Sequence, residues 1–136
     1  MIERILLLGV VVAVVLLVRA YMTHMTRRAT KQTIDMPENN RGNAGVISFS
    51  ADGCVQCEKL QKPALARLHT QRSDVPVTHL RVEEHQDLAK KLGIFTVPST
   101  IVHDAAGTVR NLNLGYTDDV TLFNQLAVVS APPHCL

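Results

Sequence analysis

The fold is decided by a short stretch of the chain, VISFSADGCVQC, at residues 46–57. Residues 46–50 are apolar or small and rich in β-formers, which predicts a short buried strand. Residues 51–53, Ala-Asp-Gly, are typical of a turn, and a C-x-x-C pair formed by Cys54 and Cys57 follows at once. A dithiol at the junction of a strand and a helix is therefore the first candidate site.

A helix is predicted over residues 55–70, because its apolar positions recur at helical spacing. Pro63 is expected to kink it. The buried face is expected to consist of Leu60, Ala64, Leu65 and Leu68. Cys54 then lies at the first turn, where unpaired backbone N–H groups and the helix dipole stabilise a thiolate. We therefore predict Cys54 as the attacking nucleophile and Cys57, one turn on, as the resolving thiol.

The rest of the folded part alternates between strands and helices. The expected elements are strands at residues 77–82, 99–103 and 108–114, a short helix at 87–92, and a last helix that Thr117 caps. The order is βαβαββα, an α/β fold with a parallel pair across the first crossover and an antiparallel hairpin at the end. His79 and His103 fall within strands and are interpreted as sheet residues rather than catalysts.

A second motif is centred on Pro98, forty-one positions after Cys57, where Thr96-Val97-Pro98-Ser99-Thr100 heads a strand and Asp104-Ala105-Ala106-Gly107 follows it. Together with residues 49–57, this motif resembles the thioredoxin family over about residues 45–129. The resemblance implies a thioredoxin-like fold and a redox-active cysteine pair that acts on protein or peptide disulfides and dithiols. It also implies a cis Val97–Pro98 bond packed against the pair, with the Val97 backbone pairing with an extended substrate. A trans-proline at the start of an edge strand is the alternative.

Four residues near the cysteine pair depart from the family pattern. Val55-Gln56 stands between the cysteines where general thioredoxins have Gly-Pro, Gly53 stands where they have Trp, and Ser48 occupies the position of a buried acid. Without that carboxylate, proton removal from Cys57 needs water or another group. A second hypothesis is therefore a non-catalytic binding module that holds a partner in the groove around Val97-Pro98.

Two further predictions concern charge at the cysteine pair and metal binding. Asp52 and Glu58 flank the pair and are expected to oppose thiolate formation. Zinc binding by the pair with His134 and Cys135, a copper-carrying loop, and two purely structural cysteines are the alternative readings. We expect no metal. No P-loop or dinucleotide fingerprint is present, and we expect no cofactor.

An apolar run precedes the folded part. Its fourteen residues, 5–18, form a helix of about 21 Å, which is shorter than the ~30 Å hydrocarbon core. Continuing through Arg19, which can snorkel, and Tyr21 to residue 25 gives about 31 Å. We expect an uncleaved single-pass anchor in the cell membrane that contacts lipid through residues 5–25. A cleaved signal and a buried core helix are the alternatives, but no small-x-small cleavage site follows the run.

Charge and polarity divide the rest of the chain. We expect an anchor at residues 1–25, a polar linker at 26–44, a thioredoxin-like domain at 45–131 and a tail at 132–136. Residues 1–44 hold six Lys/Arg against three Asp/Glu, and the positive-inside rule leans toward a cytoplasmic domain. Residues 45–136 hold eight Lys/Arg against nine Asp/Glu and contain few aromatic residues. This composition argues against nucleic-acid binding. Cys135 is expected to be an exposed tail thiol, with a third redox cysteine or an intermolecular disulfide as alternatives.

Overall fold

The computed structural model of the chain describes residues 1–29, 32–35 and 38–130, so the expectations for Pro37, His134, Cys135 and the tail lie outside the described residues. The elements in chain order are α1 (Ile2–Ala29), η1 (Glu38–Asn40), β1 (Gly45–Ser50), η2 (Cys57–Gln61), α2 (Lys62–Gln71), β2 (Val77–Arg81), α3 (Gln86–Leu92), β3 (Ser99–His103), β4 (Val109–Leu114) and α4 (Asp119–Ser130).

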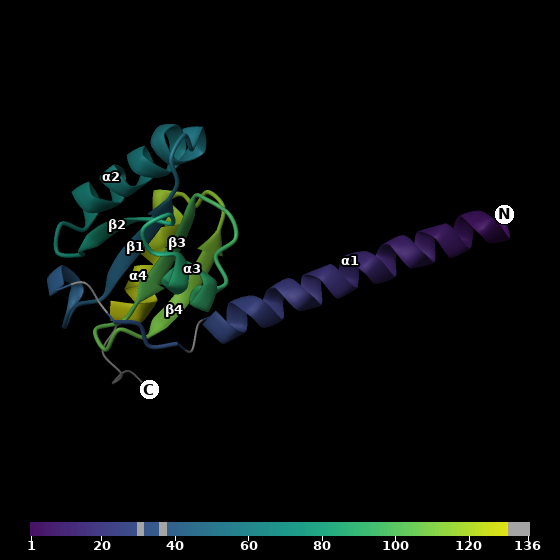
Figure 1. Cartoon of the computed structure of the whole chain (residues 1–136), viewed down its shortest axis with the longest axis horizontal. Coiled ribbons are helices and arrows are strands. Elements are labelled where there is room, and N and C mark those ends of the chain that lie inside the picture. Colours follow the sequence, from purple (N-terminus) through teal and green to yellow (C-terminus); the bar gives the residue numbers. More distant parts are fainter. Residues whose placement is uncertain (30–31, 36–37, 131–136) are drawn as a thin grey trace.

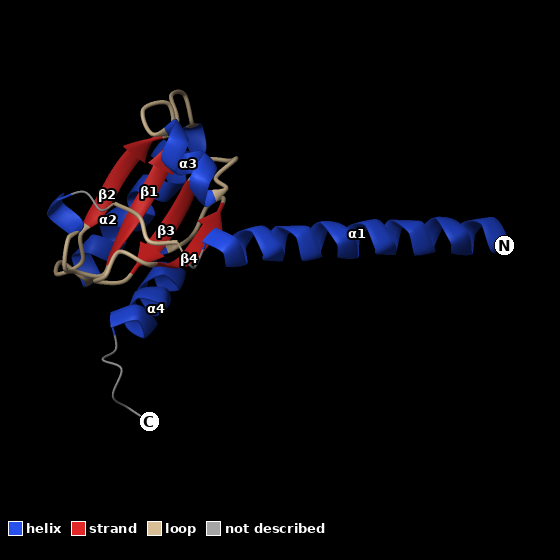
Figure 2. Ribbon diagram, turned by 60° about the horizontal axis from the view of Figure 1, so that its bottom comes forward, coloured by secondary structure: helices blue, strands red, loops and turns tan. Residues whose placement is uncertain are grey.

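The four strands form one mixed sheet in the order β2-β1-β3-β4. β1 pairs in parallel with β2, and the β1–β3 and β3–β4 pairs are antiparallel. The predicted order βαβαββα is therefore confirmed. α2 and α4 cover one face of the sheet and α3 lies on the other (Figures 1 and 2).

Strand alternation divides the core between the two faces. Ile47 and Phe49 pack with α3 residues on one side, whereas Val46 and Val102 pack with α2 and α4 on the other. Since helices cover both faces, the residues of β3 are buried throughout and those of β1 nearly so. The continuous apolar character of residues 46–50 follows from this two-sided burial.

The helix after the cysteine pair contains a π turn that sequence periodicity did not predict. Helical backbone begins at Val55, passes through η2 and continues as α2, and the Lys62 N–H donates to the Cys57 carbonyl five residues back. Pro63 has no N–H for the next α-helical bond, which favours this irregular turn just before it. The extra residue rotates the helix face. Leu60 is 47% exposed and the expectation that it is buried was wrong, whereas Gln61 is buried.

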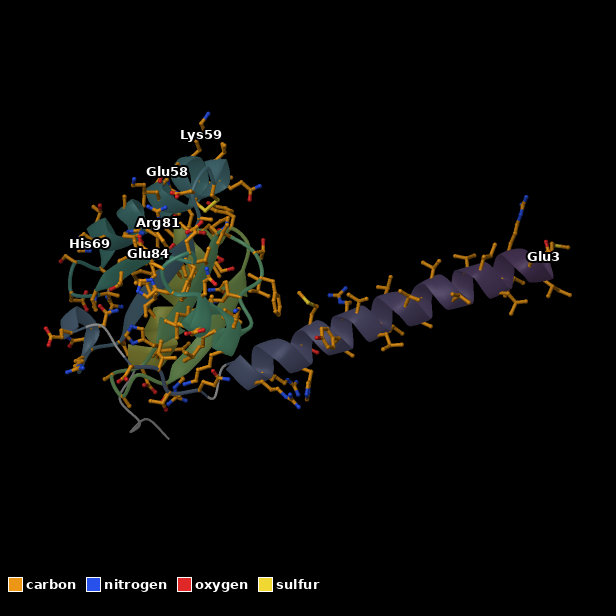
Figure 3. All side chains as sticks on the ribbon, in the orientation of Figure 1. Glu3, Glu58, Lys59, His69, Arg81 and Glu84 are labelled. Atoms are coloured by element: carbon orange, nitrogen blue, oxygen red, sulfur yellow. A yellow bond between two sulfur atoms is a disulfide. The ribbon has the colours of Figure 1, made fainter. Side chains whose placement is uncertain are left out.

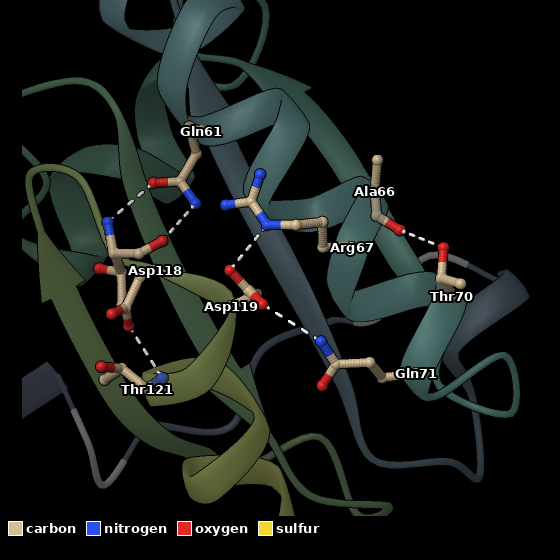
Figure 4. A network of polar contacts seen from close by, with 9 residues as sticks. Gln61, Ala66, Arg67, Thr70, Gln71, Asp118, Asp119 and Thr121 are labelled. Atoms are coloured by element: carbon tan, nitrogen blue, oxygen red, sulfur yellow. Dashed lines mark hydrogen bonds and ion pairs between the residues drawn. The ribbon is translucent and has the colours of Figure 1, made fainter.

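The last helix is capped by a different residue from the one expected. Asp118 Oδ1 accepts a hydrogen bond from the Thr121 N–H at 2.9 Å, which makes Asp118 the N-cap of α4. Thr117 is buried instead, and its backbone N–H and C=O are both hydrogen-bonded to the side chain of Gln61, which is labelled in Figure 4. The prediction of Thr117 as the cap was wrong because Gln61 holds that residue's backbone.

Part of the polar segment before β1 packs on the domain. Thr33 forms an antiparallel bridge with Thr108, and the Ile34 N–H donates to the Gly107 carbonyl at 3.1 Å. Ile34 is buried in the core on the α3 side. β4 is an edge strand, so its outer backbone N–H and C=O groups are available to hydrogen-bond with another segment of the chain. Residues 32–34 therefore add to the sheet edge, which an expectation of a plain polar linker did not include.

α1 projects away from the sheet (Figure 1). Within it, Ile2–His24 is long and apolar enough to cross a membrane, and its residues are exposed. This exposure argues against the buried core helix. A signal sequence at the N-terminus meets the same criterion of length and composition.

Candidate functional site

The predicted cysteine pair forms a disulfide at the end of β1. The Cys54 and Cys57 Cα atoms are 5.3 Å apart, and the bond lies at the end of the domain where Glu58 and Lys59 are labelled (Figure 3). Cys54 is partly exposed and Cys57 is buried. The Cys57 N–H donates to Cys54 Sγ at 3.2 Å, so a backbone donor already points at the more accessible sulfur.

Local backbone bonds hold the loop that carries Cys54. Its N–H donates to the Ala51 carbonyl at 3.3 Å, and its carbonyl accepts from the Glu58 N–H at 3.3 Å. Gly53 has a φ of 73°, a left-handed conformation that glycine adopts without a steric cost. Cys54 therefore lies at the helix start, and its sulfur accepts from the Cys57 N–H, one of the N–H groups that the first turn leaves without a helical partner.

The two acids that flank the pair both have cationic partners. Asp52 pairs with Arg81, and Glu58 pairs with Lys62 at 3.0 Å. The Asp52 N–H also donates to Glu83 Oε1 at 3.0 Å. Backbone N–H groups, first that of Glu83 itself and then that of Asp52, lower the pKa of the Glu83 carboxyl. Since these pairs are exposed they are weak, but each places a positive charge beside an acid that was expected to oppose a thiolate.

Val97 and Pro98 lie at the same end of the sheet as the cysteines. The Val97–Pro98 peptide bond is cis. Pro98 is buried and Val97 is half-buried. Ser99 pairs with Phe49, so Pro98 stands beside the carboxyl end of β1, where the loop to Cys54 begins. The structure therefore brings the predicted catalytic and substrate-binding residues together at one end of the sheet.

Apolar side chains are exposed in the two segments that meet at this end of the sheet. Val55, between the cysteines, is 62% exposed, and Phe95, three residues before Pro98, is 65% exposed. Such residues offer contacts to an apolar segment of a partner.

A small cavity of about 120 Å³ reaches Cys57 from the α2 side of the sheet. We call it the Cys57 cavity. It is lined by Cys57, Ser48 and His79, with Ser50, Glu58 and Lys62. Sequence reasoning interpreted His79 as an ordinary sheet residue. The alternation of side chains along a strand could have indicated that His79 reaches this cavity. In a parallel pair with Ser48 opposite His79, both side chains lie on the same face of the sheet.

His103 is the other strand histidine, and its interpretation as a satisfied sheet residue is confirmed. Its ring is fully buried. Nε2 accepts from Asn40 Nδ2 at 3.2 Å, and Nδ1–H donates to the Asp104 carbonyl at 3.0 Å. Asn40 Oδ1 in turn accepts from Thr78 Oγ1 at 2.9 Å. These hydrogen bonds fix η1 to the sheet, and they occupy both ring nitrogens of His103.

No group of three or more His, Cys, Asp or Glu side chains within the described residues could hold a metal ion. The zinc alternative needed His134 and Cys135, which lie outside that part of the chain. The chemistry that the described site offers is that of two sulfur atoms, one partly exposed and one buried.

Comparisons with known proteins agree on the fold. The thioredoxin family model matches residues 25–127. No curated protein matches the chain. Among solved structures, an uncharacterised thioredoxin-like protein from Clostridium perfringens is similar, with 24% identity and a TM-score of 0.60 over 71% of this chain and 79% of the other.

Two further solved structures are similar at lower identity. A thiol-disulfide isomerase from Corynebacterium glutamicum has 18% identity and a TM-score of 0.59, over 73% of this chain and 88% of its own. A thioredoxin from Fasciola hepatica has 17% identity and a TM-score of 0.57, over 68% and 86%. At these identities the likeness is one of fold.

Proposed function

This chain belongs to the thioredoxin family, and from that premise we propose that it is a membrane-tethered thiol-disulfide oxidoreductase acting on protein substrates. The observation that carries the proposal is the asymmetry of the pair: Cys54 is partly exposed at a helix start and Cys57 is buried one turn on. Such an arrangement gives an accessible attacking sulfur and a protected resolving sulfur.

In the reductive direction, the Cys54 thiolate attacks one sulfur of a substrate disulfide. A bond forms between Cys54 Sγ and that sulfur, the substrate S–S bond breaks, and the other substrate sulfur leaves as a thiolate. The Cys57 N–H, 3.2 Å from Cys54 Sγ in the disulfide form, is positioned to donate to the attacking thiolate. The Cys57 thiolate then attacks Cys54 Sγ, which restores the Cys54–Cys57 disulfide and frees the second substrate sulfur.

Two electrons thus pass from the cysteine pair to the substrate, and the reverse sequence oxidises a substrate dithiol. The sulfur atoms carry both electrons, so the exchange needs no cofactor. We propose that the substrate lies along Val97 and Pro98 as an extended segment, with its apolar side chains against Val55 and Phe95. Pairing of the half-buried Val97 backbone with an extended segment gives affinity without demanding one sequence.

We propose that residues 1–25, which include most of α1, anchor the protein in the cell membrane, with lipid around residues 5–25. Residues 45–131 form the catalytic domain and residues 132–136 a tail. Tethering raises the local concentration of membrane-side substrates. The charge bias leans toward a cytoplasmic domain. In a Cys57→Ser, Cys135→Ser variant Cys54 is the one remaining thiol of the three cysteines, and labelling it in intact cells with an impermeant thiol reagent tests this: protection supports the cytoplasmic side, and labelling supports the opposite side.

The test of the function compares two variants of the full chain in detergent micelles, both in a Cys135→Ser background that removes the tail thiol. Cys54→Ser is expected to abolish reduction of a protein disulfide, because no accessible sulfur remains. Cys57→Ser is expected to trap the substrate as a mixed disulfide on Cys54, because the resolving sulfur is absent. A Cys54→Ser variant with an unchanged rate would contradict the proposal.

A further inference from the structure

The proposed function does not explain how the buried thiol of Cys57 loses its proton. To resolve the mixed disulfide it must lose its proton, but its side chain is only 6% exposed and burial disfavours a thiolate. The β1 residue Ser48, which shares a cavity with Cys57, is 4% exposed and offers a hydroxyl, which is not a base at neutral pH. A proton acceptor must therefore come from another residue that reaches the same space.

The Cys57 cavity defines which residues reach that space. Besides Cys57 and the serines, its polar lining consists of Glu58, Lys62 and His79. Its volume of about 120 Å³ holds several water molecules at ~30 Å³ each, so a proton can pass through water rather than by direct contact. Glu58 is a poor acceptor because its carboxylate is already paired with Lys62 at 3.0 Å.

His79 meets the requirements for the acceptor. The β1–β2 register places it directly beside Ser48, with its side chain toward α2. Its ring has no hydrogen-bond partner within residues 32–35 and 38–130, which leaves an acceptor nitrogen free. The side chain is also exposed to solvent, so a proton taken from the cavity can leave to bulk water.

Although the residue is open to solvent on one side, its ring is partly covered, and this desolvation is the first cause that lowers the pKa of His79; Lys62 lowers it further, and Glu58 raises it. The ring is therefore neutral at pH 7. The titratable groups that face it are Cys57, Glu58 and Lys62 across the cavity, and His69 of α2 in the adjacent groove. The charges of Glu58 and Lys62 offset each other, since the two form an ion pair.

Resting on the proposed function, we propose that His79 accepts the proton of Cys57 through the Cys57 cavity when the mixed disulfide is resolved. Cys57 Sγ–H passes its proton, by way of water, to the neutral imidazole. The resulting thiolate attacks Cys54 Sγ, the Cys54–Cys57 bond forms, and the bond from Cys54 to the substrate sulfur breaks. The substrate sulfur leaves with the electron pair, and the imidazolium releases its proton to solvent.

The experiment separates the two sulfur steps in one trace. Reduced full-length Cys135→Ser protein in detergent micelles is mixed with an equimolar aromatic disulfide whose thiolate absorbs visible light. Attack by Cys54 releases the first thiolate, and resolution by Cys57 releases the second. A Cys57→Ser variant must lack the second phase; if it keeps that phase, or if the parent protein lacks it, the proposed function itself fails.

With both phases established, His79→Gln is expected to slow the second phase about 100-fold at pH 7, at the lower end of what general-base catalysis contributes. The first phase should not change. In the parent protein the second rate should rise with pH through an inflection below about 6.5, the ordinary pKa of histidine, and His79→Gln should lose that inflection. A merely structural role for His79 would not remove an inflection from one phase alone.

His69→Gln is the matched control, because His69 lines the adjacent groove and not the Cys57 cavity. It should leave both rates and the inflection unchanged. The inference is overturned if His79→Gln keeps the second rate and its inflection, or if Glu58→Gln slows that phase and His79→Gln does not. Circular dichroism of each variant verifies that the fold is retained.

Discussion

Replacing Gln61 with methionine tests whether the buried amide locks the π turn to the loop before α4. Gln61 Nε2 donates to the Thr117 carbonyl at 3.0 Å, and the Thr117 N–H donates to Gln61 Oε1 at 3.0 Å. Gln61 is 1% exposed and Thr117 is 8% exposed. Methionine fills a similar volume, so the change removes both hydrogen bonds while leaving little cavity.

The expected cost follows from the two backbone groups that lose their partner. A buried donor or acceptor left unsatisfied costs about 1–3 kcal/mol, and two such groups give roughly 2–6 kcal/mol. Local relaxation and water entry offset part of this, so we expect a loss of about 2–4 kcal/mol in the free energy of unfolding. With an m-value of about 2 kcal/mol/M, the urea midpoint falls by about 1–2 M.

The assay is urea unfolding of the full chain in detergent micelles, followed by circular dichroism, with the disulfide intact in all samples. Gln71→Met is the control. Gln71 lies on the same helix, but its side chain is exposed and its hydrogen bond to Asp119 Oδ2 is 3.2 Å long (Figure 4). It should cost less than about 0.5 kcal/mol. If Gln61→Met costs no more than Gln71→Met, the reasoning about buried partners is refuted.

Three further changes test the packing and the caps in the same assay. Gly45→Ala should destabilise by about 1–3 kcal/mol, because a Cβ there would lie 2.8 Å from His103 Nε2 and 2.9 Å from the Pro76 carbonyl oxygen; a neutral result would mean that β1 shifts freely. Asp118→Ala should cost about 1 kcal/mol by removing the bond to the Thr121 N–H, and an unchanged midpoint would rule out this cap. Burial lowers the pKa of His103, so the unfolded chain binds its proton first: stability should be full above about pH 6.5 and fall below it, and His103→Gln should flatten this dependence. An equally steep fall in the variant would assign the effect to other groups.

The elements that could be predicted are those whose signal is local. The strand at residues 46–50 follows from its apolar run, and Gly93 ends α3 with a φ of 71°, as its position after the helix predicts. Cys54 at the helix start and Pro98 at the head of β3 are likewise fixed by their neighbours in sequence. These local signals were enough to predict the order of the elements and the position of the cysteine pair after β1.

The features that were missed depend on contacts between distant segments. Thr117 and Asp118 are both good capping residues, and the choice between them is made by Gln61, fifty-six positions away. Leu60 is exposed because one residue is added to the helix turn before Pro63. Burial of Ile34 depends on pairing at the edge of β4, which a polar segment read in isolation does not reveal.

The same reason explains why the surroundings of Cys57 were harder to predict than the cysteine itself. His79 belongs to a strand that joins β1 through a crossover, and only the register Ser48–His79 brings it to the cavity. The alternation of side chains along a single strand predicts on which face of the sheet His79 lies. Which residues share that face depends on the pairing of the whole sheet.

A redox titration of the cysteine pair tests the central claim most directly. The full chain with Cys135→Ser is equilibrated in dithiol buffers between about −320 and −120 mV, the range of cellular thiol couples. The sample is then quenched in acid and alkylated, and mass spectrometry gives the ratio of alkylated dithiol to disulfide. We predict one reversible two-electron transition of Cys54 and Cys57, with a tenfold change in ratio for each ~30 mV. A pair that stays fully oxidised or fully reduced throughout would contradict the account and favour a binding module without redox activity.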